Sequence, residues 1–316
     1  MTRGSALGAR SARALLMLVA MIGLAGCEPA ERVPARGPKA PPCPPPPEPA
    51  YQAAVVGTIG KMHMVESRYP LSKLGDVLAA FKPELVLVAA RVDPFHEGRL
   101  EDASFEMTYV TNLAKQHGIS VEPIDWYREQ DLGAPLAPVE PWDEAEIAKK
   151  EAEVLGLPRL YNFEQANGSE LEEKVLLATG AEARHRSGNP LTTRRHAWIQ
   201  QLTASAVSRH GRPKRVLAYV DVLDRPVVDL LLHGVGYTMK EPVAVVSKSK
   251  DEMISGIPAD VMNEWKAQLD RTRARIEAAK AAPEKAFWSD RQRTLQVAVD
   301  KRASCCVSQS ALSVAP

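Results

Sequence analysis

The chain has 316 residues, of which 45% are hydrophobic and 25% charged, and its formal net charge is +1. A net charge so close to zero produces no field that would attract a polyanion, so we expect no nucleic-acid partner. Many of the 25 prolines lie before residue 50. The remainder, about 260 residues, is long enough for one large α/β domain or two small ones.

Residues 1–26 have the features of an export signal. Arg3, Arg10 and Arg13 form a basic region, and an apolar run over residues 14–26 follows them. This run is shorter than the roughly 20 residues that a membrane-spanning helix needs, so we expect it to be cleaved. Its end, Leu-Ala-Gly followed by Cys27, resembles the bacterial lipobox. An ordinary secretory signal with an incidental cysteine is the alternative.

The lipobox resemblance implies a cell-envelope protein that is held to the membrane by acyl chains on Cys27. Glu28, which is not an aspartate, implies the outer membrane, facing the periplasm. Residues 27–50 are rich in proline, and we interpret them as a stiff linker. Three further cysteines remain in the mature chain: Cys43, Cys305 and Cys306. An oxidising compartment would allow the first to pair with either of the other two, and the sequence leaves that pairing open.

From residue 51 onward, strand and helix patterns alternate. The predicted strands are 53–59, 84–90, 119–124 and 215–220, and the predicted helices are 71–81, 105–118, 193–211 and a short one within 225–237. This order predicts an α/β domain over 51–250 with a central, mainly parallel sheet and helices on both faces. Charged amphipathic segments predict a helical insertion over 143–180. Two further charged segments predict a helical C-terminus, with helices at 260–282 and 284–302 followed by a tail to 316.

Short phrases within residues 53–240 follow a common framework. They are VVGTIG at 55–60, KPELVLVA at 82–89, GISVEPID at 118–125, RRHAWIQQL from Arg194, RVLAYVDVLD at 215–224 and LLLHGVGY ending at Tyr237. In order and character they resemble the TraB, GumN, ChaN and Tiki superfamily of α/β proteins. The resemblance implies that fold, with a ligand site at the strand ends. The binding candidates are Gly57, Thr58, Gly60, Arg128 and Arg195.

The sequence departs from the superfamily where the resemblance places its reactive groups. Gly60 stands where the family turn has a histidine, and Ala89 stands where the second strand has a glutamate. At the later strand, Asp221 and Asp224 replace the family's glycine and histidine. Glycine and alanine supply no side-chain lone pair for a metal or for acid–base chemistry. We therefore expect a domain that has lost catalysis and acts by binding a small molecule or a protein.

Two alternative interpretations predict a bound metal ion or haem at the strand ends. His63 and Glu66, in the turn after the first strand, would return an imidazole and a carboxylate to the site. Together with Asp125 and Asp224 they would form a variant divalent-metal site, which predicts a metal-dependent, peptidase-like hydrolase. The resemblance to ChaN, which is also a lipoprotein, implies haem or iron binding instead, with His63 or Tyr69 as the ligand.

Asp125 and Arg195 each have two interpretations. Asp125 matches the end of the family's third strand, but an aspartate there also caps a turn. Arg195, at the start of the long helix, would bind an anion or pair with a carboxylate. Asp93, His96 and Glu97 are close in sequence, and without a second cluster we interpret them as part of a solvated loop. The sequence has no GxSxG, Walker, GxGxxG or HExxH motif, which leaves serine-hydrolase, nucleotide-binding and zincin functions without support.

Overall fold

The structure, a computed structural model, describes residues 50–127, 162–185, 191–247 and 257–300, together with positions 145 and 149. The predicted signal and linker, the lipidation residue Cys27 and the binding candidate Arg128 lie outside the described residues. The same holds for Cys43, Cys305 and Cys306. Within the described part, no helix is both long enough and apolar enough to cross a membrane.

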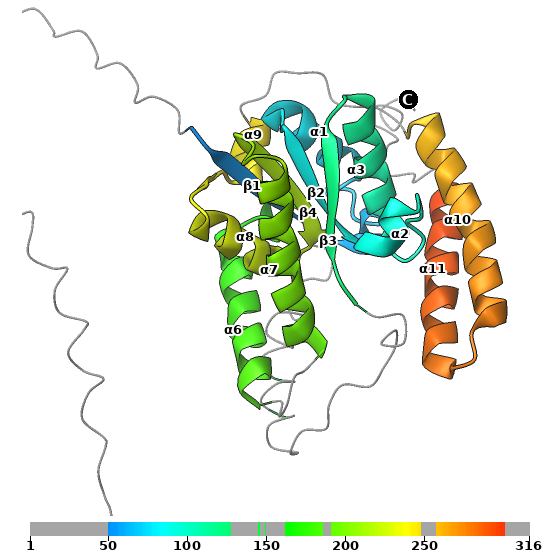
Figure 1. Ribbon diagram of the computed structural model, residues 1–316. Helices are drawn as coiled ribbons and strands as arrows, with labels where there is room; N and C mark the ends of the chain where they lie inside the picture. The colour runs from blue at the N-terminus through cyan, green and yellow to red at the C-terminus, as the bar shows by residue number, and fades with distance from the viewer. Residues whose placement is uncertain are drawn as a thin grey trace, which may run out of the picture. The chain divides into compact units, whose positions relative to one another are not determined.

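A five-stranded sheet forms the centre of the domain, and its strands are all parallel. They are β1 (Gln52–Thr58), β2 (Leu85–Arg91), β3 (Ser120–Asp125), β4 (Arg215–Asp221) and β5 (Thr238–Met239). Their order across the sheet is β3-β2-β4-β1-β5 (Figure 1). The strand β4 therefore lies between the first two strands of the chain and pairs with both. The predicted α/β class with a parallel sheet is confirmed.

Helices cover both faces of the sheet, as the alternating sequence pattern predicts. One face carries α1 (Ser72–Phe81), α3 (Phe105–Gln116) and α9 (Pro242–Ser247). The other face carries α7 (Leu191–Arg209) and α8 (Arg225–Gly234). Shorter or more peripheral elements are the 3-10 helix η1 (Gly60–Met64), α2 (Val92–His96), α5 (Phe163–Ala166) and α6 (Ser169–His185). Figure 1 shows α7 and α8 on one side of the central strands and α3 on the other.

Alternation along the strands divides the buried core into two clusters. Val56 of β1 and Tyr219 of β4 pack toward α1 and α3. The intervening residues, such as Val55, pack toward α7 and α8. This period of two is what a pleated strand requires, and burial on both faces explains the nearly continuous apolar runs. Thr58 follows Val56 by two residues and Asp221 follows Tyr219 by two, so the same alternation places both side chains on the face that α1 and α3 cover.

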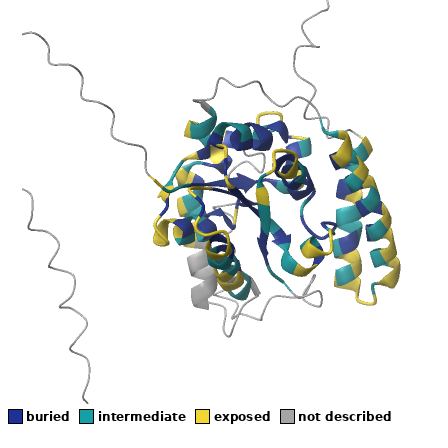
Figure 2. Ribbon diagram, turned by 45° about the horizontal axis from the view of Figure 1, so that its top comes forward, coloured by how far each residue is buried: buried dark blue, intermediate teal, exposed yellow. Residues whose placement is uncertain are grey.

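The C-terminal region is a helical hairpin that packs against α3. It consists of α10 (Ala259–Ala278) and α11 (Ala282–Asp300). Trp265 of α10 is fully buried, its indole N–H donates to the backbone carbonyl of Phe105 at 3.0 Å, and the two rings lie 5.5 Å apart. Figure 2 shows exposed outward surfaces on this hairpin and buried central strands. The helical C-terminus is therefore an integral layer of the domain.

Some local boundaries differ from the sequence prediction. The helix α10 ends four residues before the predicted boundary at 282, because Ala279 adopts an extended backbone conformation. The elements η1, α2 and β5 have no predicted counterpart, since two to five residues are too few for a periodic signal. Of the predicted insertion over 143–180, the described part forms α5 and α6, and α6 extends to His185.

Candidate functional site

The carboxyl ends of the strands are where parallel sheets of this kind hold their ligands. After β1 the chain passes to α1 on one face, whereas after β4 it passes to α8 on the other. Ligand sites form between neighbouring strands that diverge in this way. We call the ends of β1 to β4, with the residues that follow them, the carboxyl edge. Asp125 ends β3 at this edge, and Asp221 ends β4.

Arg195, near the start of α7, joins two carboxylates at the carboxyl edge. Its guanidinium donates to Asp125 at 2.7 and 2.8 Å and to Asp224 at 2.8 and 2.7 Å. His196, the next residue, places Nε2 3.0 Å from Asp224 Oδ1. The two carboxylates are buried, whereas a quarter of the Arg195 side chain reaches solvent. We call these four residues the Arg195 network; bidentate contacts of this kind fix both geometry and charge.

The charges of the network reinforce one another. Burial alone would raise the pKa of Asp224, but Arg195 and His196 outweigh it and lower that pKa to about 2. Burial likewise opposes the positive charge of Arg195, and the two carboxylates outweigh it, so the pKa of the guanidinium is raised. Asp125 also accepts a hydrogen bond from the backbone N–H of Trp126 at 2.7 Å. Asp125 therefore holds the backbone of the residue that follows it and also joins the network.

Asp221 lies at the same edge; the residue as a whole is exposed, but protein atoms surround its carboxyl group. Its Oδ1 accepts the backbone N–H of Leu223 at 2.9 Å. Loss of hydration among the surrounding protein atoms, then the nearby Asp224 carboxylate, raise the pKa of Asp221 to about 7. Asp224 acts in this direction because Arg195 and His196 keep its carboxylate ionised. Asp221, which ends β4, and Asp224, which lies three residues later, therefore have pKa values shifted in opposite directions.

The raised pKa of Asp221 predicts a pH dependence of stability. The folded chain binds this proton more tightly than the unfolded chain, whose reference pKa is 3.8. Its contribution is complete below pH 3.8 and is lost as the pH rises through about 7. Urea unfolding between pH 4 and 8 should show this decline in the wild type, a flatter curve in Asp221→Asn and the wild-type curve in Asp93→Asn, an exposed control. Equal slopes in the wild type and Asp221→Asn would contradict the shift.

Two stacked tryptophans lie beside the Arg195 network. The rings of Trp126 and Trp198 have centroids 5.3 Å apart and planes inclined by 19°. Trp126 follows Asp125 directly, and Trp198 lies one helical turn after Arg195 on α7. Trp198 is 37% exposed, which leaves part of an aromatic surface open to solvent next to the charged groups.

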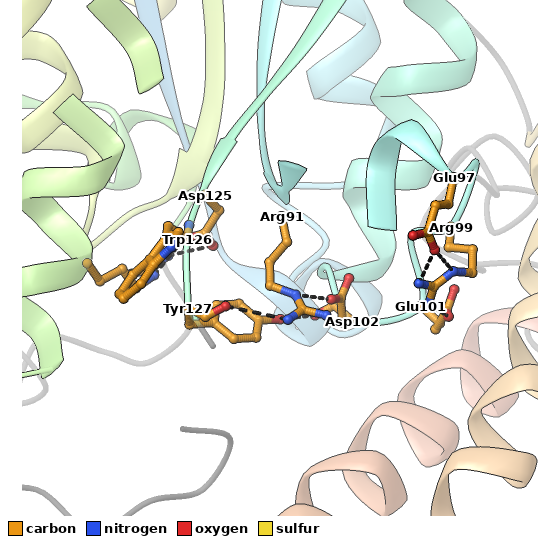
Figure 3. Close-up of polar contacts among 9 residues, drawn as sticks. Arg91, Glu97, Arg99, Glu101, Asp102, Asp125, Trp126 and Tyr127 are labelled. Atoms are coloured by element: carbon orange, nitrogen blue, oxygen red, sulfur yellow. Dashed lines mark hydrogen bonds and ion pairs between the residues drawn. The ribbon is translucent and has the colours of Figure 1, made fainter. Parts of the chain in front are cut away.

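The end of β2 carries a second ion pair at the same edge. Arg91 donates from Nε to Asp102 at 2.5 Å, and its guanidinium carbon lies 4.9 Å from the centre of the Tyr127 ring. Figure 3 shows Arg91 and Asp102 close to the run of Asp125, Trp126 and Tyr127, and Arg99 farther along beside Glu97 and Glu101. The Tyr127 hydroxyl donates to the Asp102 carbonyl at 3.1 Å. These contacts fix the chain that leaves β3.

His63 lies in the core and its ring is fully engaged. Its Nδ1–H donates to the Tyr69 carbonyl at 2.9 Å, and Nε2 accepts the backbone N–H of Ile59 at 3.3 Å. Burial lowers the pKa of His63, which keeps the ring neutral. Tyr69 is buried too, and its hydroxyl donates to the Gly57 carbonyl at 2.8 Å. In this arrangement neither ring nitrogen nor the phenol has a lone pair directed toward a metal or haem.

Glu66, the other residue that the predicted metal site takes from the turn after β1, is also engaged in the structure. Glu66 is buried and held by Arg68, which donates to both of its oxygens at 2.9 and 2.8 Å. His63 and Glu66 therefore do not join Asp125 and Asp224 in one site. Within the described ranges, no three His, Cys, Asp or Glu side chains are arranged to hold a metal ion.

Gly60 and Ala89, which the sequence resemblance sets against a histidine and a glutamate, have structural roles. Gly60 opens η1 with a positive φ of 55°, a conformation that favours glycine. Ala89 lies on β2 and packs against both core clusters. Asp93, His96 and Glu97 are exposed, and Glu97 pairs with Arg99 rather than with the other two.

Asn167 covers the end of β1. Its Oδ1 accepts the N–H of Gly57 at 2.9 Å, and its amide donates to the Phe163 carbonyl at 3.0 Å. A Cβ on Gly57 would lie 3.0 Å from the Ala166 carbonyl oxygen and 3.1 Å from Val222 Cα. The short helix α5 can therefore approach β1 only because residue 57 lacks a side chain.

This close approach predicts that Gly57→Ala destabilises the domain by about 1–3 kcal/mol, since backbone atoms on both sides must shift. Gly234→Ala is the matched control, because a Cβ there has nothing within 4 Å and alanine favours the helix. Chemical denaturation followed by circular dichroism measures both. Equal stability of the two variants would show that α5 does not pack on β1 in this way.

Sequence reasoning missed several polar residues of the edge. His196, Asn167, Glu106 and the Arg91–Asp102 pair carry no motif of their own. The only feature of the sequence that could have indicated His196 is its position directly after Arg195, since Arg195 is already a candidate for the strand ends. Asn167 gives a local signal only for the α5 turn, where Asn162 and Gln165 form a capping box.

Comparison with known proteins adds no relative. No protein-family model matches the chain, and neither a curated protein nor a solved structure matches it. The likeness to the TraB, GumN, ChaN and Tiki superfamily therefore stays a prediction from the sequence phrases.

Proposed function

We propose that this chain is a lipid-anchored protein of the bacterial outer membrane, and that its TraB/GumN/ChaN-like domain binds a ligand at the carboxyl edge without turning it over. The observation that carries the proposal is the four hydrogen bonds from Arg195 to Asp125 and Asp224. These bonds occupy the two carboxylates at the carboxyl edge, Asp125 and Asp224, that the predicted variant metal site would need. His63 and Glu66, its other two members, are engaged elsewhere.

The ligand class follows from the groups that remain accessible. They are Asp221, which is exposed as a residue, the exposed quarter of the Arg195 side chain and the Trp126–Trp198 surface. Charged groups next to an aromatic face suit a small polar molecule with one flat apolar side. A short segment of a partner protein that presents the same chemistry is the alternative.

A thermal-shift panel of sugars, amines and short peptides tests binding at this edge. We expect a compound of this kind to raise the Tm of the full-length chain and to lose the effect in Trp198→Ala. The variant Leu230→Ala removes another exposed apolar side chain, on α8, and should respond as the wild type does. A shift that persists in Trp198→Ala would contradict binding at the tryptophan pair.

A hydrolase of the same fold is the second candidate, and one observation favours it. Asp221 and Asp224 have pKa values shifted in opposite directions, a pattern that suits one carboxyl group as proton donor and the other as a fixed charge. In that case Asp221, which is exposed, is the group that exchanges a proton with the substrate. Haem binding lacks such support, because the rings of His63 and Tyr69 are buried and engaged.

The anchor is tested separately from the domain. Acyl chains contribute roughly 0.8 kcal/mol per buried methylene, so a lipidated Cys27 should hold the chain in the membrane fraction. Changing Cys27→Ser should move the chain out of that fraction and abolish metabolic labelling with palmitate. Cys43→Ser, in the same linker, should leave both unchanged. Membrane association that persists in Cys27→Ser would contradict lipid anchoring.

A further inference from the structure

Glu106, in the first turn of α3, is a buried carboxylate without a partner. Its side chain is 0% exposed, and neither oxygen has a hydrogen-bond partner among the described residues. A carboxylate in such a place is costly unless a donor or a cation compensates it. The position near the α3 N-terminus supplies only part of that compensation through the helix dipole. Glu106 therefore needs a further partner.

Thr58, the last residue of β1, presents a second unsatisfied group. It is 1% exposed, and its Oγ1 has no hydrogen-bond partner within the described ranges. Its side chain lies on the face of α1 and α3, two residues after Val56, which packs into that core cluster. Buried hydroxyls are almost always hydrogen-bonded, so this oxygen also calls for a partner.

Asp221 brings a third oxygen donor to the same place. It pairs in register with Thr58 on neighbouring strands, which lie about 4.8 Å apart. Asp221 follows Tyr219 by two residues on β4, so its side chain lies on the same face of the sheet as that of Tyr219. This is the face that α1 and α3 cover, and the Thr58 side chain lies on it too. The turn η1, which directly follows Thr58 and Ile59, packs against α3, the helix that carries Glu106. Asp224 is not available, because Arg195 and His196 use its oxygens.

We propose that Thr58, Glu106 and Asp221 hold a hard divalent cation, of the Ca²⁺ or Mg²⁺ class, on the α1 and α3 face of the carboxyl edge. An oxygen-only donor set of two carboxylates and a hydroxyl suits these ions rather than zinc, and water completes their coordination. Asp221, which is exposed as a residue, lies where an ion can enter from solvent. The ion compensates Glu106 and the surplus negative charge around Asp221 together. This site shares no residue with the set formed by His63, Glu66, Asp125 and Asp224.

The experiment uses the metal ions alone, so its outcome is independent of the organic ligand proposed above. The full-length chain is treated with chelator, and its Tm is measured while CaCl₂ or MgCl₂ is added. At an ion concentration roughly 100 times Kd, we expect a rise in Tm of about 5 °C or more. Equilibrium dialysis with elemental analysis should then give one ion per chain.

Matched variants locate the ion. Glu106→Gln keeps the shape of the side chain and should abolish the rise in Tm and the bound ion. Asp76→Asn is the control, because Asp76 is also a buried carboxylate but pairs with Lys73 at 3.5 Å, and it should respond as the wild type does. Asp221→Asn changes an exposed residue that folding tolerates, and it should weaken binding at least tenfold.

Two results would overturn the proposal. A wild-type chain that neither binds an ion nor gains stability would show that ordered water, not a cation, satisfies Glu106 and Thr58. An unchanged response in Glu106→Gln, or in Asp221→Asn where the first variant does not fold, would place the ion elsewhere.

Thr58→Val tests the hydroxyl separately. It should weaken ion binding if the hydroxyl is a ligand, whereas an equal affinity with a raised Tm of the ion-free chain would show that the hydroxyl has no partner at all.

Discussion

Replacing Arg195 with methionine is expected to lower the free energy of unfolding by about 3 kcal/mol. The change leaves Asp125 and Asp224 buried without their cation, and removing one partner of a buried ion pair typically costs 3–5 kcal/mol. We take the lower end of that range because a quarter of the Arg195 side chain reaches solvent. Urea denaturation followed by circular dichroism at neutral pH measures the change.

Two further variants separate the network from other effects of the substitution. Arg194→Met changes the preceding arginine, which makes none of the network's hydrogen bonds, and should stay within about 0.5 kcal/mol of the wild type. Adding Asp125→Asn and Asp224→Asn to Arg195→Met should recover part of the loss, because the uncompensated charges disappear. If Arg195→Met were as stable as Arg194→Met, the network would contribute nothing to the fold.

Trp265→Ala is expected to cost about 3–5 kcal/mol, because it empties a fully buried site between α10 and α3 and removes the hydrogen bond to the Phe105 carbonyl. Trp198→Ala, which truncates a tryptophan that is 37% exposed, should cost much less. Thermal and urea unfolding of the two variants give the comparison.

Hydrogen exchange shows which part of the domain the substitution affects. If the α10–α11 hairpin is an integral layer, Trp265→Ala should lower protection in α3 and the sheet as well as in the hairpin. Loss of protection confined to α10 and α11, with an unchanged sheet, would instead show that the hairpin is a separable attachment.

The sequence predicts the framework of the fold well, because its signals are local. Residues 53–59 and 215–220 are short apolar runs between turn residues, and they are β1 and β4 within one residue at each end. The order of elements then predicts a parallel sheet, since each crossover helix must pack back onto it. What the pattern does not indicate is that β4 inserts between β1 and β2, because strand order depends on contacts between distant segments.

The site is harder to predict for the same physical reason. Asp125 and Arg195 are 70 residues apart, and Asp224 is 29 residues beyond Arg195. Each has a local interpretation, as a turn cap or a surface charge, and only the folded sheet brings the three together. The sequence does mark all three as candidates, but it does not indicate that they bond to one another.

His63 and Glu106 show where residue type misleads. A histidine in a turn suggests a solvated residue or a ligand, whereas His63 is fixed by the backbone groups of Ile59 and Tyr69. A glutamate in the first turn of a helix suggests a solvated residue that favours the dipole, whereas Glu106 is fully buried. Whether Glu106 is buried depends on which elements cover α3, and the periodicity of the sequence does not indicate that.

One measurement tests most directly the claim that the domain binds and does not catalyse. It is the rate of hydrolysis of a panel of peptides and esters by the purified full-length chain, with and without added divalent metal ions, compared with Asp221→Asn. We predict no turnover above the background that the variant shows, because the Arg195 network occupies Asp125 and Asp224 and the His63 ring is engaged. Turnover by the wild type that disappears in Asp221→Asn would contradict the account and establish the hydrolase instead.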